Sequence, residues 1–229
     1  MRHSLLLFSL FLLLTGLSAQ GQTLADSVRK PPAFLARQLV DFDARRGQLD
    51  QRGMKVLGGW AVANLLTSGI STTQTEGSAR YFHQMNVGWG AVNLALAGAS
   101  YLGARRAARV PTTDRASSVR AQLRTENLYL FNAGLDVAYL ATGVYLLEKS
   151  RNPTASGAPE RWRGYGQSLL LQGGFLLLFD GVQYAAHHRH GTRALYPLLS
   201  RVSVGYGSVA VVLPLGRHQP GTGKAWDGN

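Results

Sequence analysis

The sequence predicts an all-α fold: a four-helix transmembrane bundle of up-down topology, with an amphipathic lead-in helix and a short strand-like C-terminal segment. Three observations predict this fold. Four apolar stretches approach the roughly 20 residues that a helix needs to cross a bilayer, and polar linkers separate them. The Gly-Trp-Ala-Val-Ala-Asn-Leu motif at residues 59–65 recurs, slightly changed, at residues 88–94. Each stretch also carries one or two polar residues near its middle.

Composition narrows the classes of protein to which this chain could belong. The chain has 229 residues, a formal net charge of +12 and no cysteine, which excludes disulfides and cysteine-ligated metal centres. Most of the positive charge is arginine that flanks the apolar stretches, as membrane anchoring predicts. We therefore expect no nucleic-acid partner and no cofactor.

The N-terminus has the pattern of a secretory signal peptide over residues 1–19. Arg2 and His3 form its basic start, residues 4–15 its apolar part, and residues 16–19 a small-residue cleavage site. An uncleaved membrane anchor is the alternative interpretation.

Residues 20–53 are predicted to form a polar segment followed by an amphipathic helix. Pro31-Pro32 is a good helix start, and Leu35, Leu39 and Phe42 then recur at helical spacing between charged residues. Such a helix next to a span is expected to lie in the membrane interface.

The membrane domain is predicted to cover residues 54–190. Its spans are expected at about residues 54–71, 85–103, 128–147 and 167–186. The third and fourth spans each contain one charged residue, Asp136 and Asp180, and helices that are apolar on nearly all sides belong in lipid or in a large core. Pro111 in the middle linker is expected to end the preceding helix. Residues 191–229 are predicted to be a tail with a hairpin around Gly205-Tyr206-Gly207.

Small residues spaced four apart are predicted to be the surfaces where helices approach closely. Three such stripes occur: Gly59 and Ala63; Ala95, Ala99 and Gly103; and Gly134, Ala138 and Thr142.

Two blocks of sequence carry a resemblance to a known family. Residues 53–60 (Gly-Met-Lys-Val-Leu-Gly-Gly-Trp) and residues 81–90, which begin Tyr-Phe-His-Gln-Met-Asn, resemble those of an uncharacterised family of small bacterial integral membrane proteins. The resemblance covers about residues 33–190. It implies a four-helix membrane domain, and it implies no activity because that family is a domain of unknown function.

A polar layer inside the bundle is the candidate functional site. Because neighbouring spans are antiparallel and a helix rises about 1.5 Å per residue, the polar residues of all four spans are predicted to lie at similar depth. A carboxylate in hydrocarbon is costly unless it is protonated, paired or hydrated. One interpretation is a site for protons, cations or a small ligand, and the other is a hydrogen-bonded layer that fixes helix register. The candidate residues are Asn64, Asn93, Asn132, Asp136, Asp180, Gln183 and Tyr184.

The tryptophans of the repeated motif and the histidines after the fourth span are expected to have structural roles rather than to bind a ligand. Trp60 and Trp89 of the repeated motif are expected to anchor and pack the helices. His187, His188 and His190 are expected to be interfacial basic residues, with a surface metal site as the alternative. We predict no metal site and find no catalytic motif.

The orientation in the membrane is left open by two rules that conflict. Lys and Arg are concentrated at the end of the bundle where the first span begins, which predicts that this end is cytoplasmic. A cleaved signal peptide would instead place this end outside.

The sequence therefore predicts a multi-pass protein of the bacterial inner membrane that is not an enzyme. Its predicted role is structural or as a partner subunit, in contact with membrane lipid and with a homo-oligomer or another membrane subunit as partner. The alternative is a small transporter or ligand-binding membrane protein that uses the Asp/Asn layer.

Overall fold

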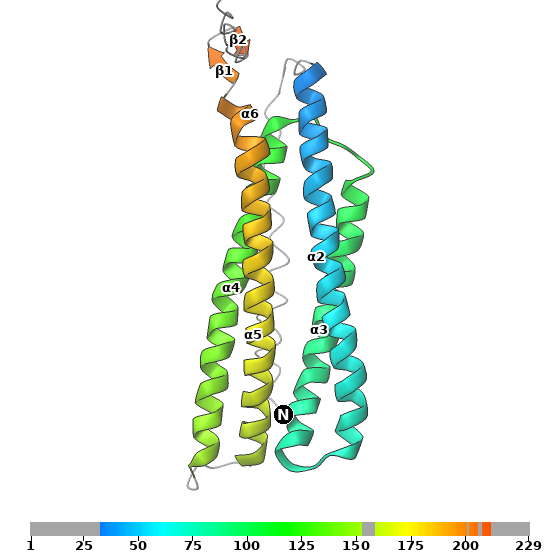
Figure 1. Cartoon of the computed structure of the whole chain (residues 1–229), viewed down its shortest axis with the longest axis vertical. Helices are drawn as coiled ribbons and strands as arrows, with labels where there is room; N and C mark the ends of the chain where they lie inside the picture. The colour runs from blue at the N-terminus through cyan, green and yellow to red at the C-terminus, as the bar shows by residue number, and fades with distance from the viewer. Residues whose placement is uncertain (1–32, 153–158, 201, 206–207, 212–229) are drawn as a thin grey trace, which may run out of the picture. The chain divides into compact units, whose positions relative to one another are not determined.

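A computed structural model describes residues 33–152, 159–200, 202–205 and 208–211. These residues are almost entirely helical (Figure 1), so the predicted all-α class is confirmed. The four long helices are α2 (Ala33–Gln74), α3 (Gly77–Ala107), α4 (Arg115–Arg151) and α5 (Pro159–His190). A π-helical turn, η2 (Gly191–Leu195), and α6 (Tyr196–Ser200) continue directly from α5. The predicted signal peptide lies outside the described residues.

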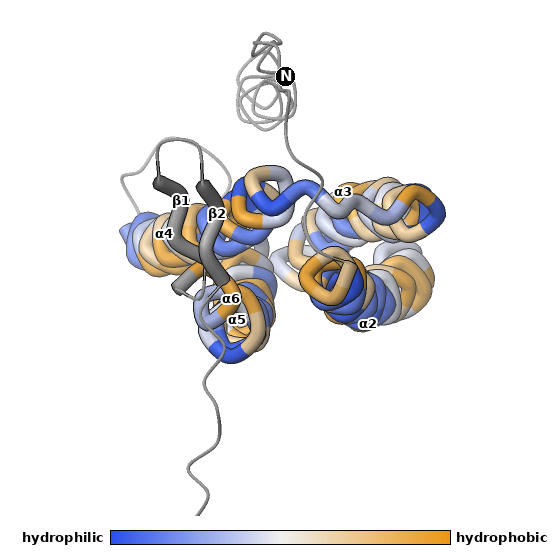
Figure 2. Tube along the Cα trace, turned by 90° about the horizontal axis from the view of Figure 1, so that it is seen from above, coloured by the Kyte–Doolittle hydropathy of each residue, from blue (hydrophilic) through white to orange (hydrophobic). Residues whose placement is uncertain are grey.

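Consecutive long helices run antiparallel. In the α2–α3 pair, Gly58 lies against Ala97 whereas Ala61, further along α2, lies against Gly90. α4 packs mainly on α5, and a contact between α3 and α5 joins the two pairs. Seen along the helices, the α4–α5 pair lies beside the α2–α3 pair (Figure 2). The order of neighbours is therefore α2, α3, α5, α4.

Each predicted span lies within one helix, but every helix is longer than its span. α2 has 42 residues and is about 63 Å long, roughly twice the hydrocarbon thickness. The expected linker at 72–84 shrinks to the two residues between α2 and α3, and that at 104–127 shrinks to residues 108–114. The linker at 104–127 is rich in Ala and Arg, which favour helix, and hydropathy reports only the apolar part of a helix.

The lead-in helix is not a separate element. α2 runs without interruption from Ala33 through the expected boundary at residue 53. Its apolar residues Leu35, Leu39 and Phe42 pack against Leu195 and Leu198 of η2 and α6. The prediction of an interfacial helix is therefore wrong, because the apolar face that lipid was expected to cover is covered by protein.

Glycines set the close contacts between helices. A Cβ on Gly143 of α4 would lie 3.0 Å from the Gly166 carbonyl oxygen, and one on Gly166 of α5 would lie 2.8 Å from the Gly143 carbonyl oxygen. A Cβ on Gly164 would lie 2.7 Å from the Phe82 amide nitrogen of α3. Only the absence of a side chain allows backbones this close.

The three predicted stripes of small residues are on the wrong faces. All their members are exposed, and a Cβ on Gly59, Gly103 or Gly134 would meet nothing within 4 Å. A spacing of four residues identifies a helix face but does not say which face meets a neighbour.

The start of α4 is fixed by its own sequence. Asp114 is the N-cap, and its carboxylate accepts hydrogen bonds from the backbone amides of Ala116 (3.3 Å) and Ser117 (2.9 Å). The Ser117 hydroxyl also donates to it, and this bond is the main reason that the pKa of Asp114 is below its ordinary value. The cap satisfies two amides that the helix itself leaves without acceptors.

Beyond α6, two short strands form an antiparallel pair, β1 (Val202–Gly205) and β2 (Ser208–Val211). Val202 pairs with Val211, and Gly205 with Ser208. The middle residue of the expected turn, Tyr206, and the tail from residue 212 lie outside the described residues.

Two helical segments in the described part of the chain are long and apolar enough to cross a membrane. They are Arg115–Arg151 and the continuous segment Pro159–Leu199. In the most apolar 18-residue stretch of each segment, only 11% of the first is buried in the protein, against 39% of the second. α2 and α3 do not reach the same apolarity.

Candidate functional site

A hydrogen-bonded network joins α2, α3 and α5. Its centre is Gln172 of α5, which is fully buried. Gln172 Nε2 donates to Asn64 Oδ1 of α2 and to Asn86 Oδ1 of α3, both at 2.8 Å, and Oε1 accepts from Trp60 Nε1 at 2.9 Å. Ser168 Oγ donates to the same Asn86 oxygen at 2.7 Å. One glutamine therefore ties three helices together, and we call these five residues the amide network.

Further contacts hold the amide network in place. Asn64 Nδ2 donates to the Trp60 carbonyl oxygen at 2.8 Å. The Trp60 ring stacks on Phe175 with ring centroids 4.0 Å apart, and His83 Nδ1 lies 3.2 Å from Ser68 Oγ. A buried network that satisfies its own members fixes one register of the helices.

Two carboxyl groups, which we call the carboxyl pair, form a second polar group between α4 and α5. Asp136 is 2% exposed and Asp180 4% exposed. Their side chains hydrogen-bond to each other, and the Asn132 side chain bonds to Asp180. Asp136 Oδ2 has no partner among the described residues. In the same part of the chain, no Lys or Arg forms an ion pair with either carboxyl group.

The amide network and the carboxyl pair are separate, so the prediction of a single polar layer is wrong. Leu176 and Phe179 of α5 lie between Gln172 and Asp180 in the sequence and belong to an apolar cluster with Leu57 of α2. The depth of each residue, calculated from the helical rise, does not reveal this separation, because the calculation ignores the direction in which each side chain points.

Towards the C-terminal end of α5, two further polar side chains are buried. His187 is 0% exposed, and its Nε2 lies 3.1 Å from Asp50 Oδ1 of α2. This is an ion-pair distance, but the directions do not form a hydrogen bond, and neither ring nitrogen has another partner among the described residues. The His187 ring stacks on Tyr129 of α4 at 5.5 Å. Gln183 fills the space beside Gly53, where a Cβ would collide with the Gln183 amide.

The π-helical turn after α5 has an identifiable cause. Gln122 Nε2 of α4 donates to the His187 carbonyl oxygen and to Glu126 Oε1, both at 2.7 Å. In a regular α-helix, that carbonyl would accept from the amide of Gly191. A side chain that occupies such an acceptor locally widens the helix, and a Cβ on Gly191 would lie 3.0 Å from Gln122 Nε2.

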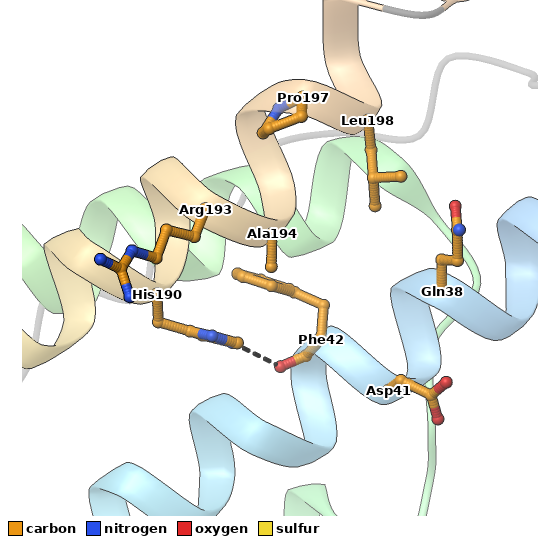
Figure 3. Close-up of a pocket in the computed structure, with 8 residues that line it drawn as sticks. All are labelled: Gln38, Asp41, Phe42, His190, Arg193, Ala194, Pro197 and Leu198. Atoms are coloured by element: carbon orange, nitrogen blue, oxygen red, sulfur yellow. Dashed lines mark hydrogen bonds between the residues drawn. The ribbon is translucent and has the colours of Figure 1, made fainter. Parts of the chain in front are cut away.

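An open pocket of about 380 Å³ lies between the start of α2 and the η2–α6 segment (Figure 3). His190 stacks on Phe42 with ring centroids 4.4 Å apart, and its Nε2 donates to the Phe42 carbonyl oxygen at 3.0 Å. Asp41 and Arg193 also line the pocket. The pocket is shallow, and its best-defined feature is the contact by which His190 of α5 holds the start of α2 at Phe42.

We expect this docking to weaken in acid. The pKa of His190 is lowered from 6.5, first because burial disfavours the imidazolium and also through electrostatic interactions with His187, Arg45 and Arg46; the bond to the Phe42 carbonyl acts in the opposite sense. The unfolded chain therefore binds the proton more readily. The stabilisation is complete above pH 6.5 and is lost as the pH falls through the folded pKa. The protection of backbone amides at the start of α2 against hydrogen–deuterium exchange, measured relative to the intrinsic exchange rate at each pH, should therefore fall over this range.

Two variants check this prediction. His190→Gln keeps a donor but cannot titrate in this range, and it should remove the pH dependence of the protection factor. His188→Gln changes an exposed histidine one turn from Tyr184, and it should leave the pH dependence of the protection factor unchanged. A protection factor that does not change with pH in the unmodified protein would contradict the prediction.

Comparison with known families identifies the chain. A model of the family of unknown function DUF6992 matches residues 56–181, more than half of the sequence. The chain belongs to this family. No curated protein and no solved structure matches it. The resemblance to an uncharacterised family is thus confirmed, and the bacterial and membrane character that it implied stay predictions. The region of the chain that matches DUF6992 contains the amide network and the carboxyl pair, whereas Gln183 and His187 lie beyond it.

The structure places the remaining predicted site residues in different surroundings. Asn93 is buried, but its Nδ2 has no partner among the described residues. Tyr184 is half-buried and stacks on His188 at 5.6 Å, away from any layer. Trp89 packs edge-on against Tyr139 at 5.0 Å and therefore links α3 to α4. Trp60 has a role in the amide network that anchoring alone did not predict.

The histidine cluster does not behave as one unit. His187 points inward, His188 Nδ1 lies 3.2 Å from Glu126 Oε2, and His190 docks on Phe42. The prediction of interfacial basic residues is wrong for His187, which is fully buried. Among the described residues, no three His, Asp or Glu side chains are arranged to hold a metal ion.

Several members of these polar groups were not predicted from the sequence. Gln172 and Ser168 lie in a leucine-rich stretch, and Asp50, Gln122 and Glu126 lie in segments that hydropathy assigns to the lead-in helix and a linker. Only Asn86 had a signal, as part of the Tyr-Phe-His-Gln-Met-Asn block on which the family resemblance depends.

Proposed function

We propose that this DUF6992 protein is a multi-pass membrane protein whose four long helices all cross the bilayer. The observation that carries the proposal is the exposed apolar surface of α4, in which only 11% of the most apolar window is buried. A core helix of a soluble protein would be mostly buried. Large apolar side chains are also exposed on the other helices, among them Leu66 and Ile70 of α2, Leu102 of α3 and Leu178 of α5.

Pairs of cations and aromatic rings support the position of the membrane. Lys55 Nζ lies 5.9 Å from the Tyr101 ring centroid near one end of the apolar surface. At the other end, Lys149 Nζ lies 4.2 Å from the Trp162 ring centroid. From Lys55 to its last residue, Gln74, α2 rises about 28 Å, close to the hydrocarbon thickness of roughly 30 Å. Aromatic residues and basic residues of this kind are enriched at membrane interfaces.

For the role of this protein, we propose a structural or partner-subunit function in the bacterial inner membrane rather than an enzymatic one. The amide network supports this, because the side-chain oxygens of Gln172, Asn64 and Asn86 are all used to hold helices together. The pocket at His190 is open, and its lining lacks a paired nucleophile and base. We propose membrane lipid and a second membrane subunit, or another copy of the chain, as partners.

A second candidate function is the binding or transport of a small ion. It is favoured by one observation: Asp136 and Asp180 contact each other while buried and without a Lys or Arg counter-ion among the described residues. Buried acids within membrane helices are functional by default.

Fractionation and native mass spectrometry test the proposal. The protein should remain in the membrane pellet after an alkaline carbonate wash and dissolve only in detergent. Its native mass in mild detergent should show a stoichiometric second subunit that persists in Asp136→Asn and Asp180→Asn. Release by carbonate would contradict the membrane assignment, and a strictly monomeric species would contradict the partner-subunit role.

A further inference from the structure

The carboxyl pair has the chemistry of a proton-binding site. Two carboxyl groups can hydrogen-bond to each other only when one of them carries a proton, because two carboxylates are both acceptors. Asp136 and Asp180 make this contact while almost fully buried. Asp136 Oδ2 is left without a partner among the described residues, which leaves an acceptor position for a second proton or a water molecule.

A second titratable pair lies nearer the end of the bundle that holds the start of α2. His187 is 0% exposed, and Asp50, its neighbour at 3.1 Å, has a side chain that is 22% exposed. Neither ring nitrogen of His187 is fixed by a hydrogen bond to another described residue. Asp50 therefore contacts the solution, and the imidazole of His187 lies directly behind it.

Polar side chains of α5 lie between the two pairs along the helix. Asp180, Gln183 and His187 follow one another at helical spacing and are buried on one face of α5. Tyr129 of α4 stacks on His187 and lies close enough to both Asp180 and Asp50 to experience their charges. Gln183 occupies the space that Gly53 leaves open.

On the side of the carboxyl pair that faces away from His187, apolar side chains pack between the helices. The α4–α5 contact beyond the carboxyl pair consists of Gly143, Gly166 and Gly173 packed against leucines such as Leu140 and Leu170. The cluster around Leu176 and Phe179 separates the pair from the amide network. The leucines and this cluster therefore cover much of the side of the carboxyl pair that faces away from His187, where Tyr139 is the nearest titratable side chain.

We propose that Asp136 and Asp180 form a binding site for one proton, which exchanges with the solution at the α2 N-terminal end through His187 and Asp50. On uptake, the proton passes from the imidazolium of His187 towards the carboxyl pair, and the imidazole returns to its neutral form. On release, the same steps run in reverse. The proposal specifies the ligand of the second candidate function and rests on the membrane assignment.

The groups that face this site come from every element packed around it. α2 supplies Asp50, and α5 supplies His187 together with His190, which interacts electrostatically with His187. α4 supplies Asn132, Tyr129 and Tyr139, whose ring experiences the charge of Asp136. α3 supplies the uncharged Trp89 ring against Tyr139. Apart from the two histidines, the titratable groups named here are carboxyl and phenol groups, which favours a bound proton.

Infrared difference spectroscopy of the full-length protein in lipid nanodiscs tests the proposal. Acidification should change the carbonyl band of a protonated carboxylic acid, and both Asp136→Asn and Asp180→Asn should remove this change. Glu148→Gln alters an exposed acid on the same helix as Asp136 and should leave the band intact. Asp180→Glu, which keeps a titratable group, should shift the band rather than remove it, and it keeps the test valid if an Asn variant does not fold.

The route is tested by the rate at which the band shifts in deuterated water. Asp50→Asn and His187→Phe should retain the band but slow its shift, while His188→Gln should not slow it. A band that persists in both Asn variants would overturn the site, and an unchanged rate would overturn the route. A band that responds to sodium at constant pH would identify a cation site instead. Because membrane extraction is measured separately, failure of the membrane assignment is distinguishable from failure of the proton site.

Discussion

Replacement of Gln172 by leucine is expected to destabilise the bundle more than any other single polar-to-apolar change. Leucine fills much of the volume but leaves Trp60 Nε1 without an acceptor and removes the donor to Asn64 Oδ1. A buried group left without its partner costs about 1–3 kcal/mol, and α2 loses both of its side-chain bonds to α5 in the amide network. The melting temperature in detergent should fall accordingly.

The matched control for this prediction lies on the same helix. Gln167 is exposed, so Gln167→Leu makes the same chemical change where no buried partner is lost, and we expect little effect. Equal melting temperatures for Gln172→Leu and the unmodified protein would show that the amide network does not hold the helices together.

Replacement of Gly164 by alanine is the second change with a large expected effect. The added Cβ would collide with the Ser78 carbonyl oxygen and lie 2.7 Å from the Phe82 amide nitrogen. Both are backbone atoms of α3, so the two helices must move apart. Overpacking of this kind costs about 1–3 kcal/mol or more, and because α3–α5 is the main contact between the two helix pairs, the pairs should separate at lower temperature.

Gly174→Ala provides the comparison. Gly174 is exposed, and a Cβ there would meet nothing within 4 Å. Since alanine favours helix over glycine by about 0.5–1 kcal/mol, this variant should be as stable as the unmodified protein or slightly more so. If Gly164→Ala and Gly174→Ala melted alike, the close approach of α3 and α5 would not be required.

The sequence predicted the helices better than their faces. Apolar stretches located all four helices, because hydropathy depends only on composition along the chain. The same signal ended α2 too early on its N-terminal side, since Leu35 and Leu39 find their partners about 160 residues away in η2 and α6. Contacts of that kind have no local signature.

The candidate site was predicted in part for the same reason. Asp136 and Asp180 were placed near each other because charged residues within apolar stretches are conspicuous. Gln172 is not predicted because it is an uncharged residue in a leucine-rich segment. Its role becomes visible only when the side chains of Asn64 and Asn86, on two other helices, are seen to point towards it. Asn93 has the same place in the repeated motif as Asn64, but its Nδ2 has no partner among the described residues.

The central claim, that all four helices cross a bilayer, is tested most directly on α2, which is less apolar than α4. The chain contains no cysteine, so single cysteines can be introduced at Leu66 and Ile70, which are 63% and 61% exposed on the protein, and at Arg109 in the α3–α4 linker. A small maleimide that reacts only in water should label Arg109→Cys in membranes, but should label Leu66→Cys and Ile70→Cys only after denaturation. Labelling of the α2 positions in intact membranes as fast as Arg109→Cys would contradict a four-span bundle.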